Sequence, residues 1–118
     1  MTNMQTHKLG VEQTRSITEP LERRGLAVKV CASRYPEAWK WMLREEDETE
    51  QPDLVYVFVA LQADGKPACH VAPSAVVAEQ VKANHERWLR TPRRDGGPHD
   101  PANTIRVFFD PDGEYRLS

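Results

Sequence analysis

Basic residues gather around position 90, at the end of a predicted helix and in the loop that follows it. They are Lys82, Arg87, Arg90, Arg93 and Arg94. Side chains of this type can contact the phosphates of a nucleic acid, and they also suit the negative end of a helix dipole. Acidic residues are interleaved with them: Glu86, Asp95 and Asp100. We therefore interpret the stretch first as a solvated face and second as a nucleic-acid contact.

Metal and redox chemistry have less support in the residue pattern. His85 falls on an apolar helical stripe, His99 lies in a loop, and no HxxxH pair occurs, so no metal site is expected. Cys31 and Cys69 lie in apolar stretches without a CxxC spacing, which is typical of buried thiols in a reducing cytoplasm. No GxSxG motif, phosphate-binding glycine loop or dinucleotide fingerprint is present, and no cofactor is expected.

The composition is that of one small domain. The chain has 118 residues, enough for a single hydrophobic core, and a net charge of -2, which gives no general attraction to nucleic acid or to an anionic membrane. No apolar run approaches the roughly 20 residues of a membrane span. We expect a flexible tail over residues 1–9, a single α/β domain over residues 10–118, a cytoplasmic location and no membrane contact.

The most distinctive element is the apolar run 54–61, which is rich in Val, Tyr and Phe and is closed by turn residues at both ends. It predicts a central strand that is covered on both faces. Period-two patterns predict further strands at residues 26–32, 68–72 and 104–109, the second forming a hairpin with the central strand. In the last strand, Ile105, Val107 and Phe109 share one face.

Helical spacing predicts a surface helix over residues 11–24 and a clearer helix over 74–90, in which His85, Trp88 and Leu89 face the core. Pro20 suggests that the first helix restarts with Thr18 as its cap. Residues 37–50 fit either a short strand or a short helix, and their acidic run is expected to be a solvated loop or helix end.

The order of several short motifs is familiar. V-x-A-S-R ends the first strand (30–34), two tryptophans follow (39 and 41), and P-D-L-x-Y-V-F-V forms the central strand (52–59). H-V-A-P-S (70–74) then leads into a helix with H-x-x-W-L (85–89). Over residues 26–116 the chain resembles small proteins of the restriction-endonuclease-like superfamily, the PD-(D/E)xK fold. The resemblance implies a small mixed β-sheet of about four to five strands flanked by helices, a truncated endonuclease-like core.

Active members of that superfamily carry an Asp on one strand and an acid or Gln followed two residues later by Lys on the next, often as Q-V-K, then a small residue and Ser. These groups hold Mg²⁺ and steady the attacking water or the phosphate. Here the resemblance places Lys29 and Cys31 at the two positions, followed by Ser33. Glu12 could match a glutamate of the first helix, but the upstream Asp and its hairpin are missing. The resemblance therefore implies a degenerate site. We interpret Lys29 and Cys31 first as part of a strand face with a snorkelling lysine and a packed thiol, and second as a relic of the site in which Lys29 is a surviving phosphate contact.

Three functions follow from these observations. The first is a non-catalytic endonuclease-like domain that binds a protein partner or nucleic acid. The second is an active Mg²⁺-dependent nuclease whose acids have migrated, with Glu12, Glu37 or Asp53 converging near Lys29. The third is a module that self-associates, for example as a homodimer, through its central sheet or a surface formed by Trp39 and Trp41.

Overall fold

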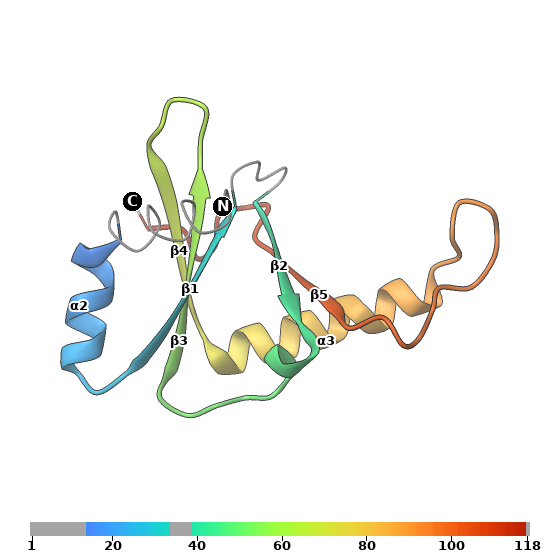
Figure 1. The fold of residues 1–118 in the computed structure, drawn as a ribbon, viewed down its shortest axis with the longest axis horizontal. Helices are drawn as coiled ribbons and strands as arrows, with labels where there is room; N and C mark the ends of the chain where they lie inside the picture. The colour runs from blue at the N-terminus through green and yellow to red at the C-terminus, as the bar shows by residue number, and fades with distance from the viewer. Residues whose placement is uncertain (1–13, 34–38, 118) are drawn as a thin grey trace.

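A computed structural model describes residues 14–33 and 39–117 of the chain (Figure 1). In this part of the chain, two α-helices and five strands form a small α/β fold, which confirms the predicted fold class. The five strands form two sheets, one of three strands and one of two, where the sequence predicted one mixed sheet. None of the helices described is long and apolar enough to cross a membrane.

The larger sheet is built around β3 (Leu54–Leu61), the predicted central strand. It pairs in parallel with β1 (Ala27–Ser33) and antiparallel with β4 (Pro67–Pro73), which gives the order β1-β3-β4 and confirms the hairpin. Residues 56–60 of β3 are fully buried. One face packs against α2, and the other against α3 and the second sheet (Figure 1). Because both faces of β3 are packed against other elements, its side chains are apolar on both faces.

The smaller sheet pairs β2 (Lys40–Arg44) antiparallel with β5 (Ile105–Phe109). Of the two alternatives for residues 37–50, the short strand is therefore correct for residues 40–44. β2 contacts the larger sheet through side chains: the Trp41 indole donates a hydrogen bond to the carbonyl of Val59 at 3.0 Å, and its ring packs on Phe58. Because these contacts replace backbone pairing, β2 lies across the face of the larger sheet instead of extending it.

The helix α2 (Arg15–Arg23) runs through Pro20 without interruption, so the predicted restart at Thr18 is wrong. Proline removes only the hydrogen bond to the carbonyl of Ser16, and Ser16 is exposed, so water can replace the donor. The helix ends at Arg23, and the chain turns away at Gly25, where φ is +84°. There the amides of Gly25 and Leu26 donate to the carbonyls of Glu22 and Leu21, a Schellman motif.

The helix α3 (Ser74–Arg90) has the predicted bounds. Its first half buries Val77, Ala78 and Val81 in the core, but its second half extends past the core. His85, Trp88 and Leu89 are therefore only half-buried, which corrects their predicted place in the core. Trp88 stacks instead on His85 and on His99 of the following loop, with ring centroids 5.4 and 4.0 Å apart. That loop has no helix or strand, as predicted.

The C-terminal segment returns to β4 through a single bridge between His70 and Arg116. His70 is fully buried, and its Nδ1 lies 2.5 Å from Asp110 Oδ2. The carboxylate of Asp110 also accepts hydrogen bonds from the amides of Glu114 and Tyr115. His70 therefore holds the C-terminal turn in place.

Candidate functional site

Two of the residues named by the resemblance, Lys29 and Cys31, lie on the face of the larger sheet that the second sheet covers. Lys29 and Cys31 are two positions apart on β1 and therefore share a face, and Lys29 is in register with Tyr56 of β3. The ammonium of Lys29 donates to Asp47 Oδ1 at 2.7 Å, the hydroxyl of Tyr56 donates to the same oxygen at 2.5 Å, and the amide of Arg44 donates to Oδ2 at 2.8 Å. We call Lys29, Cys31, Asp47 and Tyr56 the lysine cluster.

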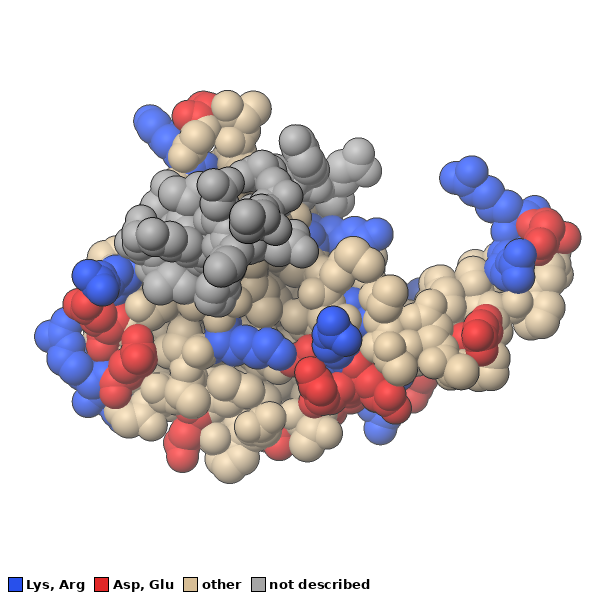
Figure 2. Space-filling view, viewed as in Figure 1, with Lys and Arg blue, Asp and Glu red and all other residues tan. Residues whose placement is uncertain are grey.

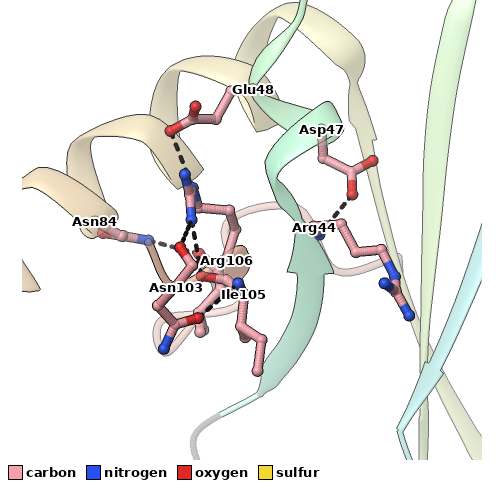
Figure 3. A network of polar contacts seen from close by, with 8 residues as sticks. Arg44, Asp47, Glu48, Asn84, Asn103, Ile105 and Arg106 are labelled. Atoms are coloured by element: carbon pink, nitrogen blue, oxygen red, sulfur yellow. Dashed lines mark hydrogen bonds and ion pairs between the residues drawn. The ribbon is translucent and has the colours of Figure 1, made fainter. Parts of the chain in front are cut away.

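Asp47 belongs to η1 (Glu45–Glu48), a single turn of 3₁₀ helix made from the acidic run. The prediction that this run is solvated holds for Glu45 and Glu46, which are exposed, but it is wrong for Asp47, whose exposed fraction is 3%. A tight turn points its side chains in different directions, so one of four successive acids can enter the interior. Figure 3 shows Asp47 and Glu48 pointing to opposite sides of this turn.

The lysine cluster combines two charged groups, the Lys29 ammonium and the Asp47 carboxylate, with two neutral groups, the Cys31 thiol and the Tyr56 hydroxyl. Burial alone would raise the pKa of Asp47, but the hydrogen bonds from Lys29, Tyr56 and the Arg44 amide outweigh it, so the pKa is lowered. Burial, opposed by the charge of Lys29, raises the pKa of Cys31 to about 12. Burial and the hydrogen bond to Asp47 raise the pKa of Tyr56. The cluster is thus close to electrically neutral at pH 7.

Of the four residues expected to mark the relic of an active site, the structure places Lys29 and Cys31 in the cluster. Ser33 lies at the end of β1 and is half-buried, and Glu12 lies outside the described residues. Among residues 14–33 and 39–117, no group of three His, Cys, Asp or Glu side chains is arranged to hold a metal ion. The cluster offers a single carboxylate, Asp47, already engaged by three donors.

The described residues do not support the alternative of an active nuclease, in which Glu12, Glu37 or Asp53 would converge near Lys29. Glu12 and Glu37 lie outside the described residues. Asp53 has φ of +65° in the turn before β3, where its carbonyl accepts a hydrogen bond from Ala27 at 2.7 Å and its side chain is exposed.

Sequence reasoning missed two members of the cluster, Asp47 and Tyr56. Asp47 is one of four consecutive acids, and nothing in the sequence distinguishes it from the others. Tyr56 is opposite Lys29 only through the parallel register of β1 and β3, which sequence periodicity does not define.

The basic residues near position 90 are exposed and spread around the end of α3. At about 100° per residue, Lys82, Arg90 and Arg87 cover an arc of about 140°. Arg87 donates to Asn84 at 3.3 Å, and Arg93 pairs with Asp95 at 2.9 Å. On the face drawn in Figure 2, Lys and Arg side chains of the whole molecule lie at several separate places, with Asp and Glu side chains close to many of them.

The ion partner of Lys29 is Asp47, and no contact in the described ranges joins Lys29 to the basic residues near position 90. The structure therefore does not bring the predicted nucleic-acid residues into one patch. Trp41 is fully buried and Trp39 is half-buried, so the two tryptophans do not form the exposed surface suggested for self-association, and self-association itself stays a prediction.

A different surface carries exposed apolar side chains. The outward face of the β2–β5 sheet and the second half of α3 enclose a groove of about 340 Å³. We call it the outer groove and define it by Lys40, Met42, Trp88, Ile105, Val107 and Phe109. The predicted alternation in β5 is confirmed, but its apolar face points outward and the other face, Arg106 and Phe108, is buried.

Two interactions explain this orientation of β5. The guanidinium of Arg106 donates to Glu48 at 3.1 Å and to the carbonyl of Asn103 at 2.8 Å, so a charge can lie inward (Figure 3). On the outer edge of the strand, the side chain of Asn84 donates to the Val107 carbonyl at 3.0 Å, and that of Gln80 accepts from the Phe109 amide at 2.8 Å. The helix α3 thus covers this edge of β5 and leaves the apolar face open.

The sequence matches no protein-family model, and comparisons with curated proteins and with solved structures give no match.

Proposed function

We propose that this protein is a non-catalytic domain of the endonuclease-like type that works by binding another macromolecule. The observation that carries the proposal is the lysine cluster. Where the resemblance leads one to expect carboxylates around a divalent cation, the chain has one carboxylate bound to its own ammonium. A carboxylate whose oxygens already accept three hydrogen bonds is a poor metal ligand, and a neutral thiol is a poor substitute for a catalytic lysine.

The binding function is supported by the outer groove. Exposed apolar side chains that form a continuous surface are typical of protein interaction sites, and Met42 is 66% exposed, Ile105 47% and Phe109 36%. The two cysteines are free thiols, which fits the proposed location in a reducing cytoplasm.

The test is a cleavage assay with the full chain, Mg²⁺ or Mn²⁺, and single- and double-stranded DNA and RNA. We expect no cleavage above that of a sample without protein. Lys29→Ala is the matched variant: cleavage by the wild type that this variant abolishes would overturn the proposal and favour the active nuclease. Cleavage that survives in the variant would point to a contaminating enzyme and would leave the proposal standing.

A further inference from the structure

We infer that the outer groove binds a segment of a partner protein that carries apolar side chains beside a carboxylate. This inference rests on the proposed function, since it names the partner of a binding domain. The inference follows from the composition of the groove, from the charge along it and from the contacts of its aromatic residues, Trp88 and Phe109.

The apolar part of the inference comes from the outward face of the smaller sheet. Four of the six side chains on this face are apolar: Met42, Ile105, Val107 and Phe109. The open face of an antiparallel sheet is normally polar, because it is in contact with water. Removing apolar side chains from water on binding is favourable in free energy and breaks no hydrogen bond to water. This face therefore favours a ligand that carries apolar groups.

The charged part comes from Lys40. Its ammonium lies 5.7 Å from the centre of the Phe109 ring, and it makes no ion pair with any described residue. Among the described residues no Asp or Glu lines the groove, and its other cation, Arg106, is already paired with Glu48. An unpaired cation beside an apolar surface is complementary to a carboxylate that approaches along that surface.

The groove is also asymmetric along its length. Lys40 lies at one end of β2, and at the other end Arg44 borders a hollow that Glu45 and Glu46 share. A carboxylate of the partner would meet repulsion at that second end. We therefore place the acidic residue of the partner at the Lys40 end and its apolar residues over Met42 and Ile105.

A nucleic acid fits the groove less well. Bases bind single-stranded sites by stacking on open aromatic faces. Trp88 is half-buried and is already stacked with His85 and His99. The Phe109 ring has the Lys40 ammonium over it, 5.7 Å from its centre. The other outward side chains are aliphatic, and among the described lining residues only Lys40 is a cation without an ion pair, which suits an acidic and apolar peptide better than a phosphate backbone.

The experiment uses short fluorescein-labelled peptides and the full chain, with binding followed by fluorescence anisotropy. The first peptide alternates Glu with Leu and Phe, the second replaces Glu by Lys, and the third replaces Leu and Phe by Ser. We expect the first to bind at least roughly tenfold more tightly than the other two. A labelled single-stranded oligonucleotide is the comparison ligand.

Three variants locate the site. Lys40→Glu should weaken binding of the Glu peptide by about tenfold and strengthen binding of the Lys peptide, because it reverses the charge at that end of the groove. Met42→Glu should weaken the Glu peptide by at least about tenfold. Lys66→Glu is the matched control, because Lys66 is exposed in the β3–β4 turn, away from the groove, and this change should alter binding by less than about twofold.

The outcomes separate the inference from the proposed function. If the oligonucleotide bound more tightly than the Glu peptide and Lys40→Glu weakened it, the inference would be wrong and the binding function would stand. Equal weakening by Lys40→Glu and Lys66→Glu, or no binding of the Glu peptide, would also overturn the inference. A homodimer that Met42→Glu dissociates in a sedimentation experiment would identify a second copy as the occupant and overturn it as well. Metal-dependent cleavage abolished by Lys29→Ala would instead remove the proposed function.

Discussion

Asp47 connects three parts of the chain, and its replacement by Ala is the sharpest test of the lysine cluster. The change removes the acceptor of hydrogen bonds from Lys29, Tyr56 and the Arg44 amide. We expect the free energy of unfolding to fall by about 3 kcal/mol, measured by urea denaturation at pH 7.

The magnitude follows from the surroundings of the three donors. The hydroxyl of Tyr56 would remain in a residue that is 1% exposed, and a buried donor without a partner costs about 1–3 kcal/mol. The Arg44 amide loses one hydrogen bond, which contributes about 1 kcal/mol. The side chain of Lys29 is 42% exposed, so water can solvate its ammonium and the ion pair itself adds at most about 1 kcal/mol.

The pH dependence gives a second readout. Since the pKa of Asp47 is lowered in the folded protein, its contribution to stability is complete above the ordinary value of 3.8. The contribution disappears as the pH falls through the lower, folded-state pKa. The stability difference between the wild type and Asp47→Asn should therefore be constant near neutral pH and shrink in acid.

Glu46→Ala is the matched control, because Glu46 is an exposed acid in the same turn. It should change the free energy of unfolding by no more than about 0.5 kcal/mol. If Asp47→Ala and Glu46→Ala unfolded at the same urea concentration, the contacts of Asp47 would not stabilise the fold, and the reasoning about the cluster would be refuted.

Three further predictions concern other parts of the fold. Glu48→Ala should lower the free energy of unfolding by about 2 kcal/mol because it leaves the buried guanidinium of Arg106 without its carboxylate, whereas Glu50→Ala, an exposed control, should not; equal urea midpoints would contradict this. Gly25→Ala should cost about 1 kcal/mol, since φ is +84° and an added Cβ meets no atom within 4 Å, so only backbone strain acts; an unchanged urea midpoint would contradict it. Because burial raises the pKa of the Cys31 thiol to about 12, its alkylation by iodoacetamide at pH 8, followed by mass spectrometry, should be at least roughly a hundredfold slower in the native than in the unfolded chain, and a comparable rate would show that the thiol is not protected.

The elements that the sequence predicted best are those whose signals are local. The central strand and α3 have their predicted bounds because each combines a long apolar pattern with turn or cap chemistry at its ends. The α/β class is confirmed on the same basis. The resemblance to the endonuclease-like superfamily remains a prediction, as do the domain bounds.

The features that the sequence did not predict depend on distant pairs. The division into two sheets depends on the Trp41 side chain bonding to Val59, 18 residues away. The inward position of Arg106 depends on Glu48, 58 residues earlier, and without that partner a charged residue in the buried face is unexpected. Period-two alternation identified the two faces of β5, but which face is exposed depends on contacts with residues distant in sequence, among them this ion pair.

The turn η1 joins the candidate relic to the candidate binding surface. Asp47 reaches Lys29 and Tyr56 in the larger sheet, and the next residue, Glu48, reaches Arg106 in the smaller one. One tight turn thus fixes the smaller sheet against the larger one. The contact that neutralises Asp47 also helps to set the position of β2 and β5, whose outward faces form the outer groove.

On the proposed function, this connection gives the acidic turn next to the cluster a structural role. A cluster of carboxylates would require a bound cation to relieve repulsion before the sheets could close over it. With Lys29 as the cation, the same interior closes with groups of the chain alone. On the proposed function, replacing a metal by an internal ammonium makes the orientation of the groove independent of any ion supplied from solution.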